Sequence, residues 1–135
     1  MGHPEVILLD THVVVWVVLD PSKLSQEAVA AIEKSIKVGN GIAMCGVSLL
    51  EIAHLVARGR IQTNSLLETF LEQIESRFVI LQLNSQIAAR AAQLPVSYPR
   101  DPMDRIIGAT AIVEDLPLVT ADAQIQQSKA VKAIW

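Results

Sequence analysis

Short aliphatic runs alternate with helical patterns along the whole chain of 135 residues. Runs typical of strands occupy residues 6–9, 42–45, 78–83, 117–120 and, as an edge strand, 131–134. Apolar residues recur at helical spacing in residues 25–38, 48–58, 64–76, 84–92 and 102–114, whereas periodicity does not decide the state of 11–19. This alternation predicts a three-layer α/β/α fold with a mostly parallel central sheet, formed by a single domain over residues 1–135.

The composition agrees with a sheet that is buried on both faces. Hydrophobic residues make up 51% of the chain but aromatic residues only 4%, so the apolar content is mainly aliphatic. No apolar stretch reaches the roughly 20 residues of a membrane span, and Glu5 and Asp10 bracket the hydrophobic stretch where a signal peptide would lie. Cys45 is the single cysteine and is predicted to be a buried, inert thiol. We expect a soluble, cytoplasmic protein with no membrane segment.

Four acidic residues fall where such a fold brings side chains to one edge of the sheet. Asp10 and Asp122 follow predicted strands, and Glu51 and Asp104 lie near the starts of predicted helices. Ligand sites in open α/β sheets form beyond the carboxyl ends of the strands. Carboxylates crowded together there would repel one another unless a cation neutralised them, and oxygen ligands suit a hard divalent ion. The pattern therefore predicts a site for Mg²⁺ or Mn²⁺.

Each acid also has a purely structural interpretation. Ser48 and Glu51 match a capping box, Asp101 followed by Pro102 is a typical helix start, and Asp122 could cap a short helix. Asp104 would then lie in a first helical turn, where the helix dipole favours an anion. The unit formed by Glu51 and His54 also resembles half of a di-iron site, but such a site needs two units in a helical bundle.

Four segments resemble the signature blocks of PIN-domain ribonucleases, specifically VapC-type toxins of toxin–antitoxin pairs. Their sequences are LLDTHV at 8–13, SLLEIA at 48–53, RDPMDRIIGATA at 100–111 and LVTAD at 118–122. The order and spacing of the blocks extend the resemblance over essentially the whole chain. One departure is the segment 123–127, which lacks the aromatic residue expected after Asp122.

The resemblance implies a PIN-like fold and a Mg²⁺- or Mn²⁺-dependent endoribonuclease in which the metal activates a water. It implies that Asp10, Glu51, Asp104 and Asp122 are the catalytic and metal-binding residues. It further implies that Thr120 and Thr11 organise the site through their hydroxyl groups, and that Asp101 is either an outer-shell ligand or only a helix cap. The implied partners are an RNA substrate, a cognate antitoxin protein and a second copy of the chain in a homodimer.

The formal net charge of −3 provides no general attraction for RNA, so any phosphate contacts must be local. The cations nearest to the acidic blocks are candidates for these contacts, although each could equally belong to a solvated surface: Arg58, Arg60, Arg100 and Arg105.

Two other functions fit parts of the pattern. A non-catalytic PIN-like binding module would share the fold. A receiver-type, Mg²⁺-dependent phosphoacceptor domain also gathers Asp residues at a sheet edge, but the chain lacks the acidic pair after the first strand and the Lys after the last strand that such a domain needs.

Overall fold

The computed structural model describes residues 6–39 and 41–135. Five parallel strands form one sheet in the order β3-β2-β1-β4-β5. The strands are β1 (Ile7–Leu9), β2 (Ile42–Cys45), β3 (Val79–Leu81), β4 (Leu118–Val119) and β5 (Ala133–Ile134). The helices are α1 (Thr11–Leu19), the 3-10 turn η1 (Pro21–Lys23), α2 (Gln26–Lys37), α3 (Gly46–Ala57), α4 (Leu67–Glu75), α5 (Ser85–Ala92), α6 (Pro102–Val113) and α7 (Ala123–Ser128). The expected parallel α/β architecture is confirmed.

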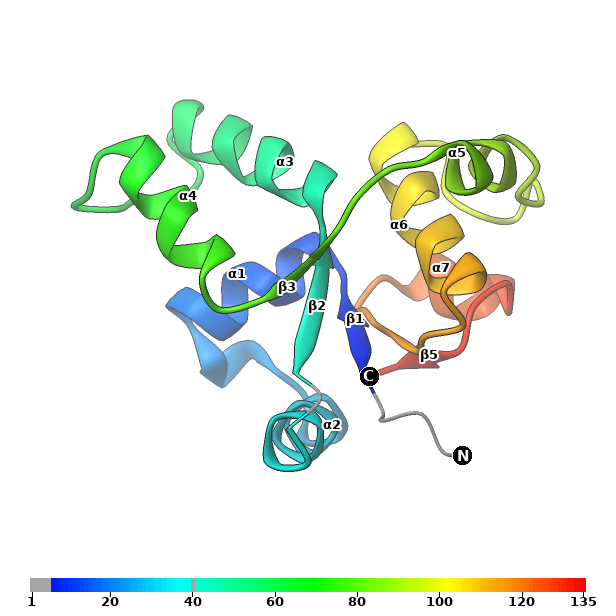
Figure 1. Cartoon of the computed structure of the whole chain (residues 1–135), viewed down its shortest axis with the longest axis horizontal. Coiled ribbons are helices and arrows are strands. Elements are labelled where there is room, and N and C mark those ends of the chain that lie inside the picture. Colours follow the sequence, from blue (N-terminus) through cyan, green and yellow to red (C-terminus); the bar gives the residue numbers. More distant parts are fainter. Residues whose placement is uncertain (1–5, 40) are drawn as a thin grey trace.

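Helices cover both faces of the sheet, as Figure 1 shows. Alternate residues of β1 point to opposite faces: Leu9 packs in the core beneath α1 to α4, and Leu8 packs beneath α6 and α7. Both side chains are fully buried. Helix α5 lies outside α6 and buries Ile87 and Ala91 against it. The aliphatic character of the strands therefore follows from burial on both sides.

Helix α1 resolves the segment whose state the sequence pattern left open. Its apolar residues surround the helix instead of forming one stripe, because Val13 and Val14 are buried while Val15, Val17 and Val18 pack against the same core at its border. The β-branched residues of this segment give only a weak preference for a strand, so its tertiary contacts decide that it is a helix. None of the helices in the described residues has the length and apolar character needed to cross a membrane.

Several predicted boundaries need correction. Helix α3 begins at Gly46 directly after β2, so Ser48 lies within the helix and does not cap it. Helix α4 begins at Leu67, and neither Asn64 nor Ser65 is its cap; the predicted strand 78–83 is shorter, because only Val79–Leu81 pairs with β2. By contrast, the helical pattern predicted from residue 25 agrees with α2, which Ser25 caps by accepting from the Ala28 amide at 3.0 Å.

Candidate metal centre

Asp10 lies at the topological switch point of the sheet, where successive strands are added on opposite sides of β1. The chain runs outward from β1 through β2 to β3 on one side, and returns to β4 and β5 on the other. Asp10 immediately follows β1, and its amide donates to the carbonyl of Val119 in β4 at 3.0 Å. Ligands bind at such switch points in open α/β sheets. Asp10 is only 2% exposed, so its carboxylate needs donors or a cation to offset its desolvation.

Two donors supply part of that compensation. The Thr11 amide donates to Oδ1 of Asp10 at 2.9 Å, and the Thr120 hydroxyl donates to Oδ2 at 2.7 Å. The same Thr120 oxygen accepts from the Asp122 amide at 3.1 Å. Thr120 thus fixes the carboxylate of Asp10 and the backbone of Asp122 in one arrangement, which is the geometry expected of a site-organising residue.

Thr11 connects the start of α1 to α3. Its hydroxyl donates to Oε1 of Glu51 at 2.6 Å and lies 2.8 Å from the Ser48 hydroxyl. The capping-box interpretation of Ser48 and Glu51 is therefore wrong: α3 starts two residues earlier, and both side chains point to α1 instead of back to the helix terminus. The structure brings Glu51 to the same end of the sheet as Asp10.

The pKa of Asp104 agrees with a convergence of the acids. Burial, as the largest cause, together with the negative charges of Asp10, Asp101, Glu51 and Asp122 in that order, raises the pKa of its carboxyl group to about 7. All of these acids act on Asp104 although they come from four different parts of the chain. A carboxyl group with this pKa is in an environment that lacks positive charge.

Asp101 and Asp122 have structural roles in addition to their charge. Oδ1 of Asp101 accepts from the Met103 amide at 2.8 Å and caps α6, and Oδ1 of Asp122 accepts from the Ile125 amide at 3.0 Å and caps α7. The capping interpretation of both residues is confirmed. Because each uses one oxygen for the cap, capping and participation in an acidic centre are compatible.

His12 joins the centre as a hydrogen-bonding neighbour. Its Nε2 accepts from the Ala121 amide at 3.1 Å, so in the neutral ring the hydrogen is on Nδ1, which lies 3.7 Å from Oδ2 of Asp10. These contacts place His12 beside Asp10.

Tyr98 is a neighbour of the centre that the sequence pattern did not reveal. Its side chain is fully buried, its hydroxyl has no hydrogen-bond partner among the described residues, and a Cβ at Gly108 would lie only 2.3 Å from that hydroxyl oxygen. Burial and the charges of Asp10, Asp104 and Asp122 raise the pKa of Tyr98. The phenol therefore remains neutral beneath the acids. Only the absence of a side chain at Gly108, one helical turn after Asp104, hinted at this close packing.

Cys45, at the end of β2, is buried as predicted. Desolvation is the main reason that the pKa of its thiol is raised to about 11, while a hydrogen bond with Thr110 acts in the opposite direction. A thiol with this pKa is protonated at neutral pH and is a poor nucleophile.

The donor set fits a hard cation that retains several waters. Within residues 6–39 and 41–135, no three His, Cys, Asp or Glu side chains form a compact cluster that would enclose an ion as they stand. The oxygens of Asp10, Glu51 and Asp122 are instead engaged by hydroxyl and amide donors. Mg²⁺ usually keeps several waters and uses only one or two protein carboxylates, so loosely spaced acids suit it. The raised pKa of Asp104 independently indicates a deficit of positive charge.

The four predicted arginines do not share one role. Arg105 donates to the carbonyls of Ala91, Leu94 and Pro99 at 3.1, 2.6 and 3.1 Å, and so fastens the loop between α5 and α6. These hydrogen bonds give Arg105 a structural role as a loop anchor, and contact with phosphate stays a prediction for it. Arg58, Arg60 and Arg100 have exposed side chains, and contact with phosphate stays a prediction for them.

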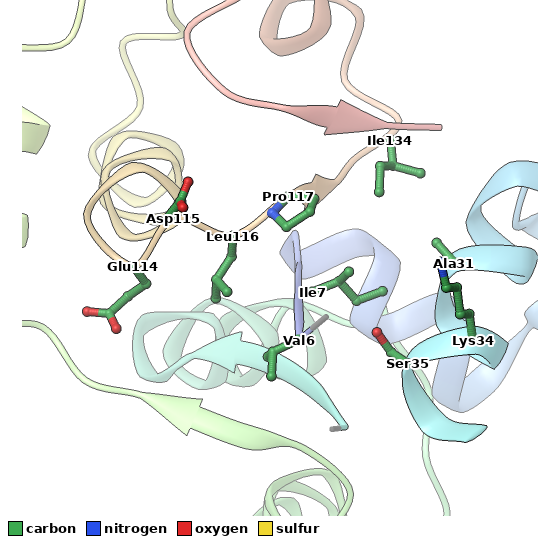
Figure 2. A pocket seen from close by; sticks show the side chains of 10 residues that line it. All are labelled: Val6, Ile7, Ala31, Lys34, Ser35, Glu114, Asp115, Leu116, Pro117 and Ile134. Atoms are coloured by element: carbon green, nitrogen blue, oxygen red, sulfur yellow. The ribbon is translucent and has the colours of Figure 1, made fainter. Parts of the chain in front are cut away.

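One cavity of the described residues lies away from the acids. It has a volume of about 700 Å³, and Figure 2 shows Val6, Ile7 and Pro117 on its wall. These residues lie at the amino ends of β1 and β4, opposite to the strand ends that carry Asp10 and Thr120. None of the four predicted site acids lines this cavity, so we do not include it in the acidic centre.

Comparison with known proteins identifies the family. The family model for the PIN domain matches residues 7–131. This chain belongs to the PIN-domain family. A curated member, Ribonuclease VapC22 of Mycobacterium tuberculosis, is 35% identical over 123 residues, which cover 91% of this chain and 92% of the relative. The resemblance expected from the four sequence blocks is confirmed.

Solved structures share the PIN fold. The VapBC2 structure from Rickettsia felis, bound to a fragment of promoter DNA, matches with a TM-score of 0.72 at 18% identity and covers 95% of this chain and 96% of that chain. FitAcB from Neisseria gonorrhoeae matches with a TM-score of 0.67 at 24% identity, covering 94% and 95% of the two chains. At these identities the likeness establishes the fold, and function has to be argued from the site.

Proposed function

We propose that this PIN-domain protein is a Mg²⁺- or Mn²⁺-dependent endoribonuclease and the toxin of a toxin–antitoxin pair. The observation that carries the proposal is the placement of the acids at one end of the sheet, where Thr120 bonds Asp10 and the Asp122 backbone and Thr11 bonds Glu51. The raised pKa of Asp104, caused by burial and by the charges of these acids, agrees with it. Acids placed at the carboxyl ends of parallel strands provide the oxygen ligands of a metal-dependent phosphodiesterase. The 35% identical relative named Ribonuclease VapC22 supports RNA as the substrate.

Asp10, Glu51, Asp104 and Asp122 would hold the metal. A divalent ion supplies the positive charge that polarises a phosphodiester and makes water a better nucleophile at neutral pH. The chain's own residues position this chemistry: Thr120 orients Asp10 and the Asp122 backbone, and Thr11 orients Glu51. Asp101 would act from outside the ligand shell, since its carboxylate caps α6 and is exposed.

We place the protein in the cytoplasm, as a homodimer that a cognate antitoxin inhibits. In support, the structural neighbours include the DNA-bound VapBC complex of Salmonella typhimurium, which matches with a TM-score of 0.69 at 16% identity. A non-catalytic binding module is the alternative. The crowding of acids around Asp104 argues against it, because a module that only binds RNA gains nothing from concentrated negative charge.

The decisive experiment is RNA cleavage by the purified protein with Mg²⁺, with Mn²⁺ and with excess chelator. Asp10→Asn keeps the shape of the side chain and should reduce cleavage by ~100-fold or more, because it removes a preorganised charge. Asp104→Asn should cause a comparable loss. Asp115→Asn is the matched control, since Asp115 is exposed, forms an ion pair with Lys132 at 3.3 Å, and lines the cavity at the amino ends of the strands, away from the acids.

Undiminished cleavage in chelator would disprove the metal mechanism. RNA binding without cleavage in any metal would favour the binding module.

A further inference from the structure

A cleft of about 350 Å³ begins beside the acidic centre and follows α1 away from it. Its walls come from α1, η1, the end of α3 and the loop after α3. His12 belongs both to this wall and to the centre, because its ring lies 3.7 Å from Asp10. Trp16 lines the cleft one helical turn further along, about 6 Å from His12 along the helix axis. A chain whose backbone crosses the acids could therefore continue into this cleft.

The apolar wall includes an aromatic ring in a fixed position. Trp16 lies edge-on to His12 with a centroid separation of 5.0 Å, and Trp135 packs against it at 5.7 Å. Leu55 and Ile61 complete this apolar lining. These two contacts hold the orientation of the Trp16 ring. Part of its surface stays exposed and faces the cleft. A preoriented aromatic ring is the kind of surface on which a nucleobase stacks.

The rim of the cleft is cationic. Lys23 and Arg60 both line it and both are exposed, whereas Asp20 is the only carboxylate in the lining and accepts a hydrogen bond from the Ser22 hydroxyl at 2.5 Å. Two cations and one anion leave the rim with a net charge of +1, in a protein whose formal net charge is −3. Gln62 adds an amide that can both donate to and accept from a base edge.

From these contacts we propose that the cleft is a nucleotide-binding subsite for the RNA substrate. A base flanking the scissile phosphate stacks on Trp16, and the adjoining phosphate lies against Lys23 and Arg60. This inference rests on the proposed ribonuclease function and extends it to the recognition of single-stranded RNA. Stacking on an aromatic ring together with backbone charge contacts requires unpaired bases, and a duplex would not present them to the cleft.

The test compares Lys23→Gln, Arg60→Gln and the double variant with a control on the opposite layer, Arg90→Gln in α5. All three positions are exposed, so the substitutions should leave the fold intact. We expect KM for a single-stranded RNA to rise about 3- to 10-fold in the double variant with little change in kcat. We also expect the slope of log K against log salt for RNA binding in chelator to fall by about 0.7 for each lost phosphate contact.

Trp16→Phe and Trp16→Leu test the stacking surface. Phe keeps a ring and should retain most of the RNA affinity, whereas Leu keeps only apolar bulk and should lose about 10-fold. Circular dichroism and urea unfolding identify any Trp16 variant that fails to fold. In that case the KM and salt-slope results of the Lys23→Gln and Arg60→Gln variants test the proposal.

The wild-type protein distinguishes failure of the subsite from failure of the proposed function. If it cleaves RNA while the variants keep wild-type KM and salt slope, the subsite is wrong. Loss of homodimer or of antitoxin binding in those same variants, with RNA binding unchanged, would assign the cleft to a protein partner and would also overturn the proposal. If the wild-type protein neither binds nor cleaves RNA, the proposed function itself has failed.

Discussion

The hydroxyl of Thr120 donates to Oδ2 of Asp10 at 2.7 Å across a sequence separation of 110 residues. Both side chains are buried, and the contact exists because β1 and β4 are adjacent parallel strands with Leu9 beside Val119. The residues that follow those two partners are therefore placed side by side at the end of the sheet.

Thr120→Val should destabilise the protein and impair the centre. The substitution keeps the shape but removes a donor from a buried carboxylate, and hydrogen bonds to charged groups contribute about 1.5–3 kcal/mol. We expect that loss in the free energy of urea unfolding and a decrease of about 10-fold or more in metal-dependent cleavage. Thr110→Val is the control, because Thr110 is equally buried but its hydroxyl bonds the Ile106 carbonyl and the Cys45 thiol instead of a carboxylate. Equal effects of the two substitutions would contradict a specific role for Thr120.

Asp104→Asn should stabilise the metal-free protein in a pH-dependent manner. The pKa of Asp104 is raised from 3.8 to about 7 in the folded state, so between these values the folded protein keeps a proton that the unfolded chain has lost. The stability of the wild-type protein in chelator therefore decreases as the pH rises from about 4 to 7, and the penalty is complete above pH 7. Asn never ionises and avoids this penalty.

Melting curves in chelator at pH 4, 5.5 and 8 measure this effect. The difference in melting temperature should be small at pH 4 and largest at pH 8, in favour of the variant. The opposing term is the helix dipole, which favours an anion in the first turn of α6 by about 0.3–1 kcal/mol. A lower melting temperature of the variant at pH 8 would show that the dipole outweighs repulsion and that the acids do not converge as described.

Metal binding should release protons near neutral pH. With a pKa of about 7, Asp104 is about half protonated at pH 7 in the metal-free protein, and a bound cation would remove that proton. Calorimetric titration with Mn²⁺ in buffers of different ionisation enthalpy should show about half a proton released at pH 7 and almost none at pH 9. Binding without proton release at pH 7 would exclude Asp104 from the metal centre.

Gly108→Ala should be one of the costlier single-methyl insertions in this chain. The added Cβ would lie 2.3 Å from the Tyr98 hydroxyl oxygen and 2.5 Å from Cζ, and overpacking of a filled core costs about 1–3 kcal/mol. Tyr98→Phe should by itself be neutral or stabilising, because it removes a buried hydroxyl without a partner among the described residues. Urea unfolding of both single variants checks these values. A destabilising Tyr98→Phe would reveal a partner for the hydroxyl.

The sequence by itself determined the class of fold and singled out the candidate acids. Short aliphatic runs are buried on both faces of a parallel sheet, and this requirement is visible residue by residue, as in Leu8 and Leu9. The sequence also contained the local signals for helix starts. Ser25, Asn84, Asp101 and Asp122 each accept the amide hydrogen bond that caps the following helix.

Tertiary structure decided the rest, because those features depend on contacts between distant segments. Ser48 and Glu51 fit a capping box locally, yet Thr11 draws both side chains toward α1. Arg105 has the sequence position of a rim cation, but it donates to three backbone carbonyls, one in the last turn of α5 and two in the loop before α6. The charge deficit at Asp104 and the burial of Tyr98 beneath it likewise arise only when separate strand ends meet, since electrostatic energy depends on distance in space and not along the chain.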